Sequence, residues 1–262
     1  MPLPRVDRLW YMKDARMRYS KEFFALQIRF ARAVAALTDR PIGQVLLDYT
    51  NIYVRFGLGR AFDRDHPTWR CYAAGLSQTA DISDWTYRFY LQQKTEVFRT
   101  QIVKTFGCFS YATQGPACVR IHFRNIEPAA ISPLSIDRLP ERLAELSALF
   151  DHVAHNQQEA TRVAGTSWLY NLRAYRRCFP QAYVASAVVA EARFRNMPLW
   201  GQFLDRNGLV RIDAAGDFIR RLSNVKNVRD LASCFPLQAL AVEAPIEDFY
   251  AFYGVAAGGS HG

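Results

Sequence analysis

The chain has 262 residues, of which 50% are hydrophobic and 14% aromatic, and a formal net charge of +9 at pH 7. This length and composition exclude a largely disordered protein and predict one large domain or two small ones. The five cysteines are dispersed without a C-x-x-C pair, which indicates thiols in a reducing compartment. No apolar run approaches the roughly 20 residues that cross a bilayer, and no signal peptide is recognised, so we expect a cytoplasmic protein with no membrane partner. The positive charge suits phosphates, an acidic protein or nucleic acid.

Helical periodicity fills roughly the first 95 residues. Residues 23–37 carry an apolar stripe and further apolar residues on a second side, so we expect this helix to be buried or to lie at an interface. Pro41 opens a second helix, and two shorter helices are expected around 67–76 and 84–93. The Gly-Leu-Gly at 57–59 follows a helix instead of joining a strand to one, which argues against a phosphate-binding loop.

The pattern changes to strands near residue 96. Residues 97–113 are rich in β-branched and aromatic side chains. Gln-Gly-Pro at 114–116 is a turn signal, so this segment is expected to form a hairpin with 118–123. Within 118–123, apolar residues alternate with Arg120 and His122, which predicts a strand that is buried on one face only.

A helix is expected over 136–156, with Ser135 as its N-cap and a leucine-rich stripe on one face. The following segment, 161–170, is short and rich in Val, Thr, Trp and Tyr, which predicts a second strand. Two strands joined by a helical crossover are normally parallel, so 118–123 and 161–170 form the predicted central unit.

The remaining chain predicts alternating short elements: a helix at 172–179, a strand at 182–194, a short helix at 197–208, an amphipathic segment over 218–231, a strand at 237–245 and a helix at 245–254. The expected fold class is α+β. A helical domain at 1–95 precedes a mixed β-sheet flanked by helices at 96–255, and a flexible tail covers 256–262.

The order of elements over about 96–200 resembles the GNAT acyltransferase superfamily. The resemblance implies that the two central strands splay apart, that the pantetheine of acyl-CoA lies in the opening, and that the next loop and helix start hold the pyrophosphate. Asn171, Ala174 and Tyr175 approximate a family pattern that follows the second splayed strand. The loop at 124–135 lacks the Gly-rich run of the family. The cofactor-binding residues implied by the resemblance are Arg124, Asn125, Ser132, Ser135 and Asn171.

Four residues are candidates for the chemistry or the substrate contacts. Tyr175 suits a general acid that reprotonates a leaving thiolate. Tyr170 and Trp168 lie two apart on the expected strand, so they share a face that lines an acyl or acceptor site; Tyr170 is also a catalytic candidate. His122 lies on the polar side of its strand, where a base must reach an amine. The structural alternatives are packing for the three aromatic residues and a hydrogen-bonded role for His122.

For other chemistries, the sequence contains no complete signature. His152 and His155 are spaced i, i+3 near a helix end without a third ligand in sequence, so no metal site is predicted. Gly165-Thr-Ser-Trp does not complete G-x-S-x-G. Cys108 lies in an apolar strand and is expected to be an inert buried thiol. The arginines at 173, 176 and 177 either meet a phosphate or an acidic carrier protein, or form a solvated helix face.

Three functions remain open. The first is an acyltransferase that moves an acyl group from a CoA or carrier-protein thioester to a small-molecule amine or hydroxyl acceptor, with the thioester as a co-substrate that is not covalently bound. The second is a tRNA- or nucleic-acid-associated transferase or binding module. The third is a non-catalytic interaction protein whose two-sided apolar helix docks a partner, or a second copy of the chain in a homodimer.

Overall fold

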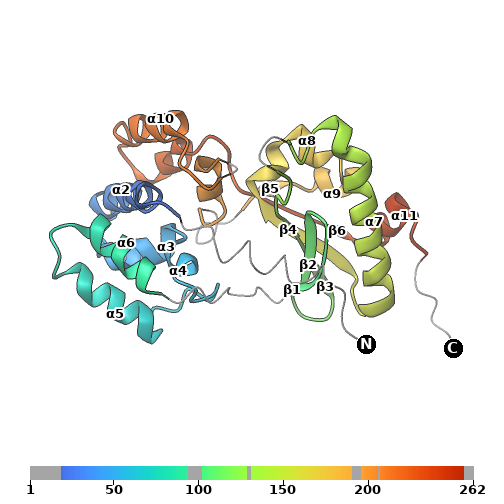
Figure 1. The fold of residues 1–262 in the computed structure, drawn as a ribbon, viewed down its shortest axis with the longest axis horizontal. Helices are drawn as coiled ribbons and strands as arrows, with labels where there is room; N and C mark the ends of the chain where they lie inside the picture. Colours follow the sequence, from blue (N-terminus) through green and yellow to red (C-terminus); the bar gives the residue numbers. More distant parts are fainter. Residues whose placement is uncertain (1–18, 94–101, 129–130, 191–195, 206, 257–262) are drawn as a thin grey trace. The chain divides into compact units, whose positions relative to one another are not determined.

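The computed structural model describes residues 19–93, 102–128, 131–190, 196–205 and 207–256. The chain forms two compact units: unit 1 comprises Met1–Phe98 and Ala192–Pro236, and unit 2 comprises Arg99–Glu191 and Leu237–Gly262. The described part of unit 1 is almost entirely helical, whereas unit 2 contains a six-stranded mixed sheet with helices (Figure 1). The expected α+β class is therefore confirmed at this level.

Unit 1 is organised around α2 (Lys21–Thr38), which packs against α3 (Ile42–Tyr49), α6 (Ile82–Gln92), α10 (Ile212–Leu222) and η4 (Val228–Cys234). Phe23, Phe24 and Phe30 are fully buried on both apolar sides of α2. The second apolar side, for which an interface was one expectation, is thus covered within unit 1. The other helices described in unit 1 are α4 (Ile52–Arg55), α5 (Pro67–Leu76) and η3 (Leu199–Phe203).

The segment 192–236 corrects the expected domain division, which placed it in the sheet domain. Phe30 of α2 contacts three rings from this segment, with centroid distances of 5.5 Å to Trp200, 5.7 Å to Phe218 and 5.2 Å to Phe235. The indole of Trp200 also donates a hydrogen bond to the carbonyl of Tyr49. These aromatic contacts attach the segment to unit 1 although more than 90 residues separate it from the first helices.

The sheet of unit 2 has the strand order β1-β2-β3-β4-β6-β5. Its strands are β1 (Ile102–Phe106), β2 (Phe109–Thr113), β3 (Cys118–Phe123), β4 (Arg162–Ser167), β5 (Val188–Val189) and β6 (Leu240–Pro245). The first three strands form antiparallel pairs, β3 and β4 are parallel neighbours, and β6 inserts antiparallel between β4 and β5. The predicted hairpin and the predicted parallel pair are both confirmed.

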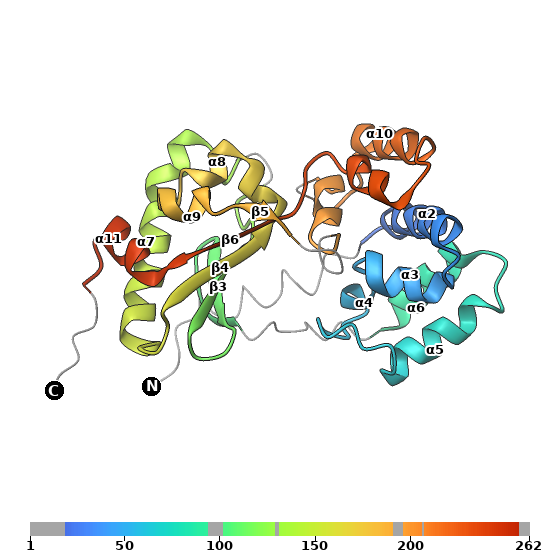
Figure 2. The same cartoon turned by 180° about the vertical axis from the view of Figure 1, so that it is seen from behind.

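Helices cover one face of this sheet. The register places Tyr111, Ile121 and Val163 on one face, and all three join the buried core with residues of four helices. Figures 1 and 2 show these helices gathered on one side of the strands. They are α7 (Leu139–Asn156), α8 (Arg173–Arg176), α9 (Gln181–Ala185) and α11 (Ile246–Tyr253), with the 3-10 helices η1 (Ile136–Arg138) before α7 and η2 (Trp168–Asn171) before α8.

Two strand predictions were wrong. β4 ends at Ser167, whose hydroxyl accepts a hydrogen bond from the backbone N–H of Leu169 and caps the 3-10 helix η2, so Trp168 and Tyr170 do not share a strand face. The expected strand at 182–194 is instead α9 followed by the two-residue strand β5, and 191–195 lie outside the described residues. Packing of the fully buried Tyr183 against Phe179 and Phe249 overrides the local strand propensity.

None of the described helices combines the length and apolar character needed to cross a membrane.

Candidate functional site

The parallel strands β3 and β4 stop pairing halfway along their length. Their register joins Cys118 to Arg162, Val119 to Val163 and Arg120 to Ala164, and ends there. Both strands nevertheless continue for three residues, to Phe123 and Ser167. We refer to residues 121–123 of β3 and 165–167 of β4 as the fork. At the fork, each strand keeps its outer neighbour but not the other strand.

Polar side chains lie at the fork on the sheet face opposite the core. We define this polar face by Ser110, Arg120, His122 and Thr166, which the register and the alternation of the strands place on one side. The Arg120 guanidinium donates one hydrogen bond of 3.2 Å to Thr166 Oγ1 across the fork and another of 3.0 Å to Gln114 Oε1. His122 is half-buried opposite Ser110 of β2. Its predicted position on the polar side of β3 is confirmed.

Tyrosine hydroxyls meet the fork on the core face. Gly165 is the first residue of β4 beyond the last pair, and a Cβ placed there would lie less than 3.0 Å from the hydroxyls of Tyr170 and Tyr183. These two hydroxyls form a 2.9 Å hydrogen bond. The Tyr175 ring is also buried and lies 5.5 Å from the Phe123 ring at the end of β3. The candidate catalytic residues Tyr170 and Tyr175 therefore lie on the face opposite His122.

The pKa values of these tyrosines are raised, chiefly by burial. Burial raises the pKa of Tyr170 to about 12, and hydrogen bonds with Tyr183 and Tyr175 only partly offset that effect. Burial also raises the pKa of Tyr175 and the pKa of Tyr183 well above the usual value, and the neighbouring phenol of Tyr170 adds to both shifts. All three side chains are protonated at neutral pH. Their hydroxyls can donate hydrogen bonds, but the raised pKa makes proton transfer from Tyr175 less favourable.

The described residues at the two ends of the loop between β3 and η1 make polar contacts. Asn125 Oδ1 accepts a hydrogen bond from the backbone N–H of Glu127, so this predicted cofactor contact also shapes the turn. Arg177 anchors the other end by donating a 2.6 Å hydrogen bond to the carbonyl of Leu134. Ser135 precedes η1 with no side-chain capping bond, and Arg124 and Ser132 are exposed.

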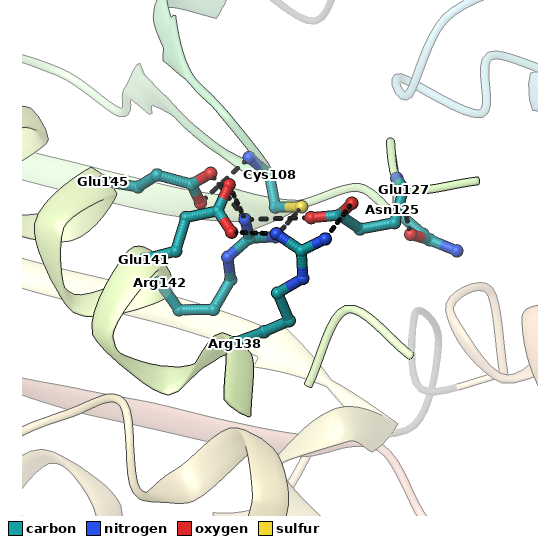
Figure 3. A network of polar contacts seen from close by, with 7 residues as sticks. All are labelled: Cys108, Asn125, Glu127, Arg138, Glu141, Arg142 and Glu145. Atoms are coloured by element: carbon teal, nitrogen blue, oxygen red, sulfur yellow. Dashed lines mark hydrogen bonds and ion pairs between the residues drawn. The ribbon is translucent and has the colours of Figure 1, made fainter. Parts of the chain in front are cut away.

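A buried arginine ties this loop to the helix and to the hairpin. Arg142 of α7 is 1% exposed, and Figure 3 shows it among Glu127, Glu141 and Glu145. Its guanidinium lies 3.1 Å from Glu127 in the loop and 2.9 Å from Glu145. Another nitrogen of the same guanidinium contacts the thiol of Cys108. Because all these elements meet one cation, the loop that follows the fork is fixed to α7 and to the β1–β2 turn.

The β1–β2 turn depends on this network as well. Glu145 Oε2 accepts a 3.1 Å hydrogen bond from the backbone N–H of Cys108. Gly107 has φ +55°, and the Glu145 carboxylate occupies the space that a side chain would need there. Burial raises the pKa of Glu145, although Arg142 and the Cys108 N–H act in the opposite direction. Burial also raises the pKa of Cys108, in line with its expected role as an inert thiol.

The other predicted site residues hold the structure around the fork. Asn171 is exposed, and its amide donates 2.8 Å hydrogen bonds to the carbonyls of Trp168 and Gln238, which ties η2 to the segment before β6. Trp168 is half-buried in η2, beyond the end of β4. His122 and Tyr170 thus lie at the fork on opposite faces of the sheet, with Tyr175 beside Tyr170 on the core face, whereas Asn171 serves a structural contact.

Several important residues were not predicted from the sequence. Tyr183 was assigned to a strand, and the partners of Arg142 are spread from residue 108 to 145. Gly165 carried a usable signal, because a glycine inside a strand often marks a close approach by another group. Among the described residues, no group of three or more His, Cys, Asp or Glu side chains could hold a metal ion. His152 instead hydrogen-bonds the Tyr111 hydroxyl at 3.0 Å.

The chain matches no known family model, no curated protein and no solved structure.

Proposed function

We propose that this protein is an acyltransferase that takes its acyl group from a CoA or carrier-protein thioester, with a GNAT-like arrangement in unit 2. One observation carries the proposal: β3 and β4 are parallel neighbours whose pairing ends after three residue pairs while both strands continue. Diverging strands expose backbone N–H and C=O groups that need partners, and an extended pantetheine amide chain can supply them.

The reaction that fits this site is a single displacement. The acceptor amine or hydroxyl attacks the thioester carbonyl carbon from the polar face, and its proton passes to His122. A backbone N–H of the fork stabilises the oxyanion that forms. The tetrahedral intermediate then releases the thiolate, which takes up a proton from solvent or from the protonated His122, so the products are the acylated acceptor and the free thiol. The hydroxyls of Tyr170 and Tyr183 line the fork on its core face and hold the donor in position.

We propose that the phosphates of the donor bind to the loop after the fork. Arg124 is exposed at its start, and the backbone N–H groups at the start of η1 carry no side-chain cap. Glu127 would repel a phosphate, but Arg142 and Arg138 lie beside it at 3.1 Å and 3.7 Å and offset its charge. Asn125, Ser132 and Ser135 remain proposed contacts of this loop.

The test compares donor fragments. CoA, dephospho-CoA and pantetheine are titrated into the protein while the melting temperature is followed, and acyl-CoA species of different chain length are then tested for thiol release. We expect CoA to raise the melting temperature. Arg124→Gln should weaken the binding of CoA without affecting the binding of pantetheine. Arg88→Gln, in unit 1, serves as the matched control. No shift with any donor at saturation would contradict the proposal.

The distribution of charge favours a second candidate function. Unit 1 contains 23 Lys and Arg against 14 Asp and Glu, a net charge of +9, whereas the ten basic and ten acidic residues of unit 2 cancel. The whole net charge of the chain therefore belongs to unit 1. Arg29 and Arg32 are exposed one turn apart on α2, and neither has an acidic partner among the described residues. We propose that unit 1 binds a nucleic acid through such cations.

Salt dependence tests this second candidate. The affinity for a fluorescent single-stranded RNA is measured between 50 and 200 mM salt, where each phosphate contact contributes about 0.7 to the logarithmic slope. We expect Arg29→Gln/Arg32→Gln to lower that slope by about one to two, and Arg173→Gln/Arg176→Gln in the neutral unit 2 to leave it unchanged. Elution of the protein from an anionic matrix at low salt would exclude this function.

A further inference from the structure

Arg120 differs in its partners from three other arginines of unit 2. Arg138, Arg142 and Arg162 each lie within ion-pair distance of at least one glutamate. Both hydrogen bonds of Arg120 go to neutral oxygens, and no carboxylate of the described residues pairs with it. This charge is half-buried at the point where the pairing of β3 and β4 ends.

The acidic residue that the described strands place on the same face is already engaged. Glu243 of β6 lies opposite Ala164, which lies opposite Arg120, so two strand spacings of about 4.8 Å separate the glutamate from the arginine. Its carboxylate pairs with Arg162 at 3.0 Å. The described residues therefore supply Arg120 with hydrogen-bond acceptors that fix its direction but with no counter-charge.

The guanidinium is held ready for a ligand. A guanidinium has five N–H groups, of which two bond to Gln114 and Thr166. The Thr166 bond crosses the fork, so the cation lies beside the place where the proposed acyl donor enters. A fixed guanidinium with unused donors is well suited to a planar carboxylate, which it can bind through two parallel hydrogen bonds.

We infer that the acceptor substrate carries an anionic group that Arg120 binds, and that it is a small amino or hydroxy acid. The inference depends on the proposed acyltransferase function. Arg120 and His122 are two residues apart on the same face of β3, which separates their backbones by about 6.7 Å. With the carboxylate held by Arg120, the amine or hydroxyl of a short acid comes within reach of His122. An acceptor without the anionic group leaves the cation unpaired.

The first experiment measures binding without catalysis. The guanidinium NMR signal of Arg120, assigned through Arg120→Gln, is followed while glycine, glycinamide, 4-aminobutyrate or O-phosphoethanolamine is added. We expect the carboxylates to shift this signal and glycinamide not to, whereas a larger shift with the phosphate compound identifies a phosphate as the anionic group. Shifts that are equal for glycine and glycinamide, or absent for all the anions, overturn the inference even if acyl transfer occurs.

The second experiment measures selectivity during transfer. Acceptors are compared in carboxylate and carboxamide pairs with one acyl-CoA donor. We expect wild type to prefer the carboxylate by about 10- to 100-fold in kcat/KM, the range expected for a charge-assisted hydrogen bond. Arg120→Gln should remove this preference while CoA binding stays unchanged. Arg162→Gln, on the same sheet face but paired with Glu243, should retain it.

The two experiments separate the inference from the proposed function. If no thioester binds or reacts, the proposed function fails, while the Arg120 signal still reports whether an anion binds at this position. If transfer proceeds equally well to both members of each pair, or if Arg120→Gln keeps the preference, the proposed function stands and the inference fails.

Discussion

Replacing Gly165 by alanine tests the packing of the fork on its core face. The new methyl group would lie less than 3.0 Å from the hydroxyls of Tyr170 and Tyr183. These two residues are 3% and 0% exposed, so their side chains cannot easily move away. Overpacking of this kind costs about 1–3 kcal/mol. Loss of the hydrogen bond between the two hydroxyls adds about 1 kcal/mol. Alanine also lowers the conformational entropy of the unfolded chain, which stabilises the folded state by about 0.4–1 kcal/mol. We expect Gly165→Ala to lower the free energy of unfolding of unit 2 by about 2 kcal/mol.

The assay must report on unit 2 alone. Of the five tryptophans only Trp168 lies in unit 2, so urea unfolding followed by the fluorine signal of 5-fluorotryptophan at this position isolates it. The signal is assigned with Trp168→Phe. Adding Tyr170→Phe to Gly165→Ala removes the closest clashing atom, so the double variant should be more stable than the sum of the single effects by about 1 kcal/mol.

A second glycine provides the matched control. Gly216 lies inside α10, and no atom lies within 4 Å of a Cβ placed there. Gly216→Ala should therefore stabilise unit 1 by about 0.5–1 kcal/mol through helix propensity. Unchanged or increased stability of Gly165→Ala in unit 2 would refute the described contact between the tyrosine hydroxyls and β4.

Further predictions concern the arginine network and the buried tyrosines. Arg142→Met should lower the free energy of unfolding of unit 2 by about 3–5 kcal/mol, because it leaves Glu127 and Glu145 without their shared cation. Glu141→Gln removes an exposed partner and should change it by less than about 1 kcal/mol; equal effects of the two variants in the same assay would contradict the network. For Tyr170, the folded-state pKa of about 12 exceeds the unfolded value near 10, so its contribution to stability is complete below pH 10 and is lost as pH rises toward 12. Urea unfolding at pH 9 and 11.5 should show wild type losing about 2 kcal/mol more than Tyr170→Phe, and parallel losses would disprove the shift.

The elements that the sequence predicts well are those with strong local patterns. The alternation around Arg120 and His122 predicts β3 and its polar side, and the leucine-rich stripe predicts the helix α7. Local patterns do not predict where segments end when a distant contact decides it. Ser167 ends β4 through its own capping bond, and Tyr183 is drawn into the core by rings from other elements.

The candidate site shows the same limit. Strand alternation is enough to place His122 on the polar face. A glycine within a strand indicates that another group lies close to the backbone at Gly165. Within the part of the chain that the structure describes, the lack of a carboxylate beside Arg120 is a property of three strands together, since it depends on Glu243 pairing with Arg162. The attachment of residues 192–236 to unit 1 likewise depends on rings that meet Phe30 in space and have no sequence spacing in common.

Backbone hydrogen exchange in the presence of a thioester donor tests the central claim most directly. Mass spectrometry of peptides covering 121–128 and 165–171 is compared with and without saturating acetyl-CoA, and peptides from α2 serve as the internal reference. We predict slower exchange in both fork peptides, because the donor amides bond to the backbone of β3 and β4, and no change in α2. Unchanged exchange at the fork with bound donor, or protection confined to unit 1, would show that the thioester lies elsewhere.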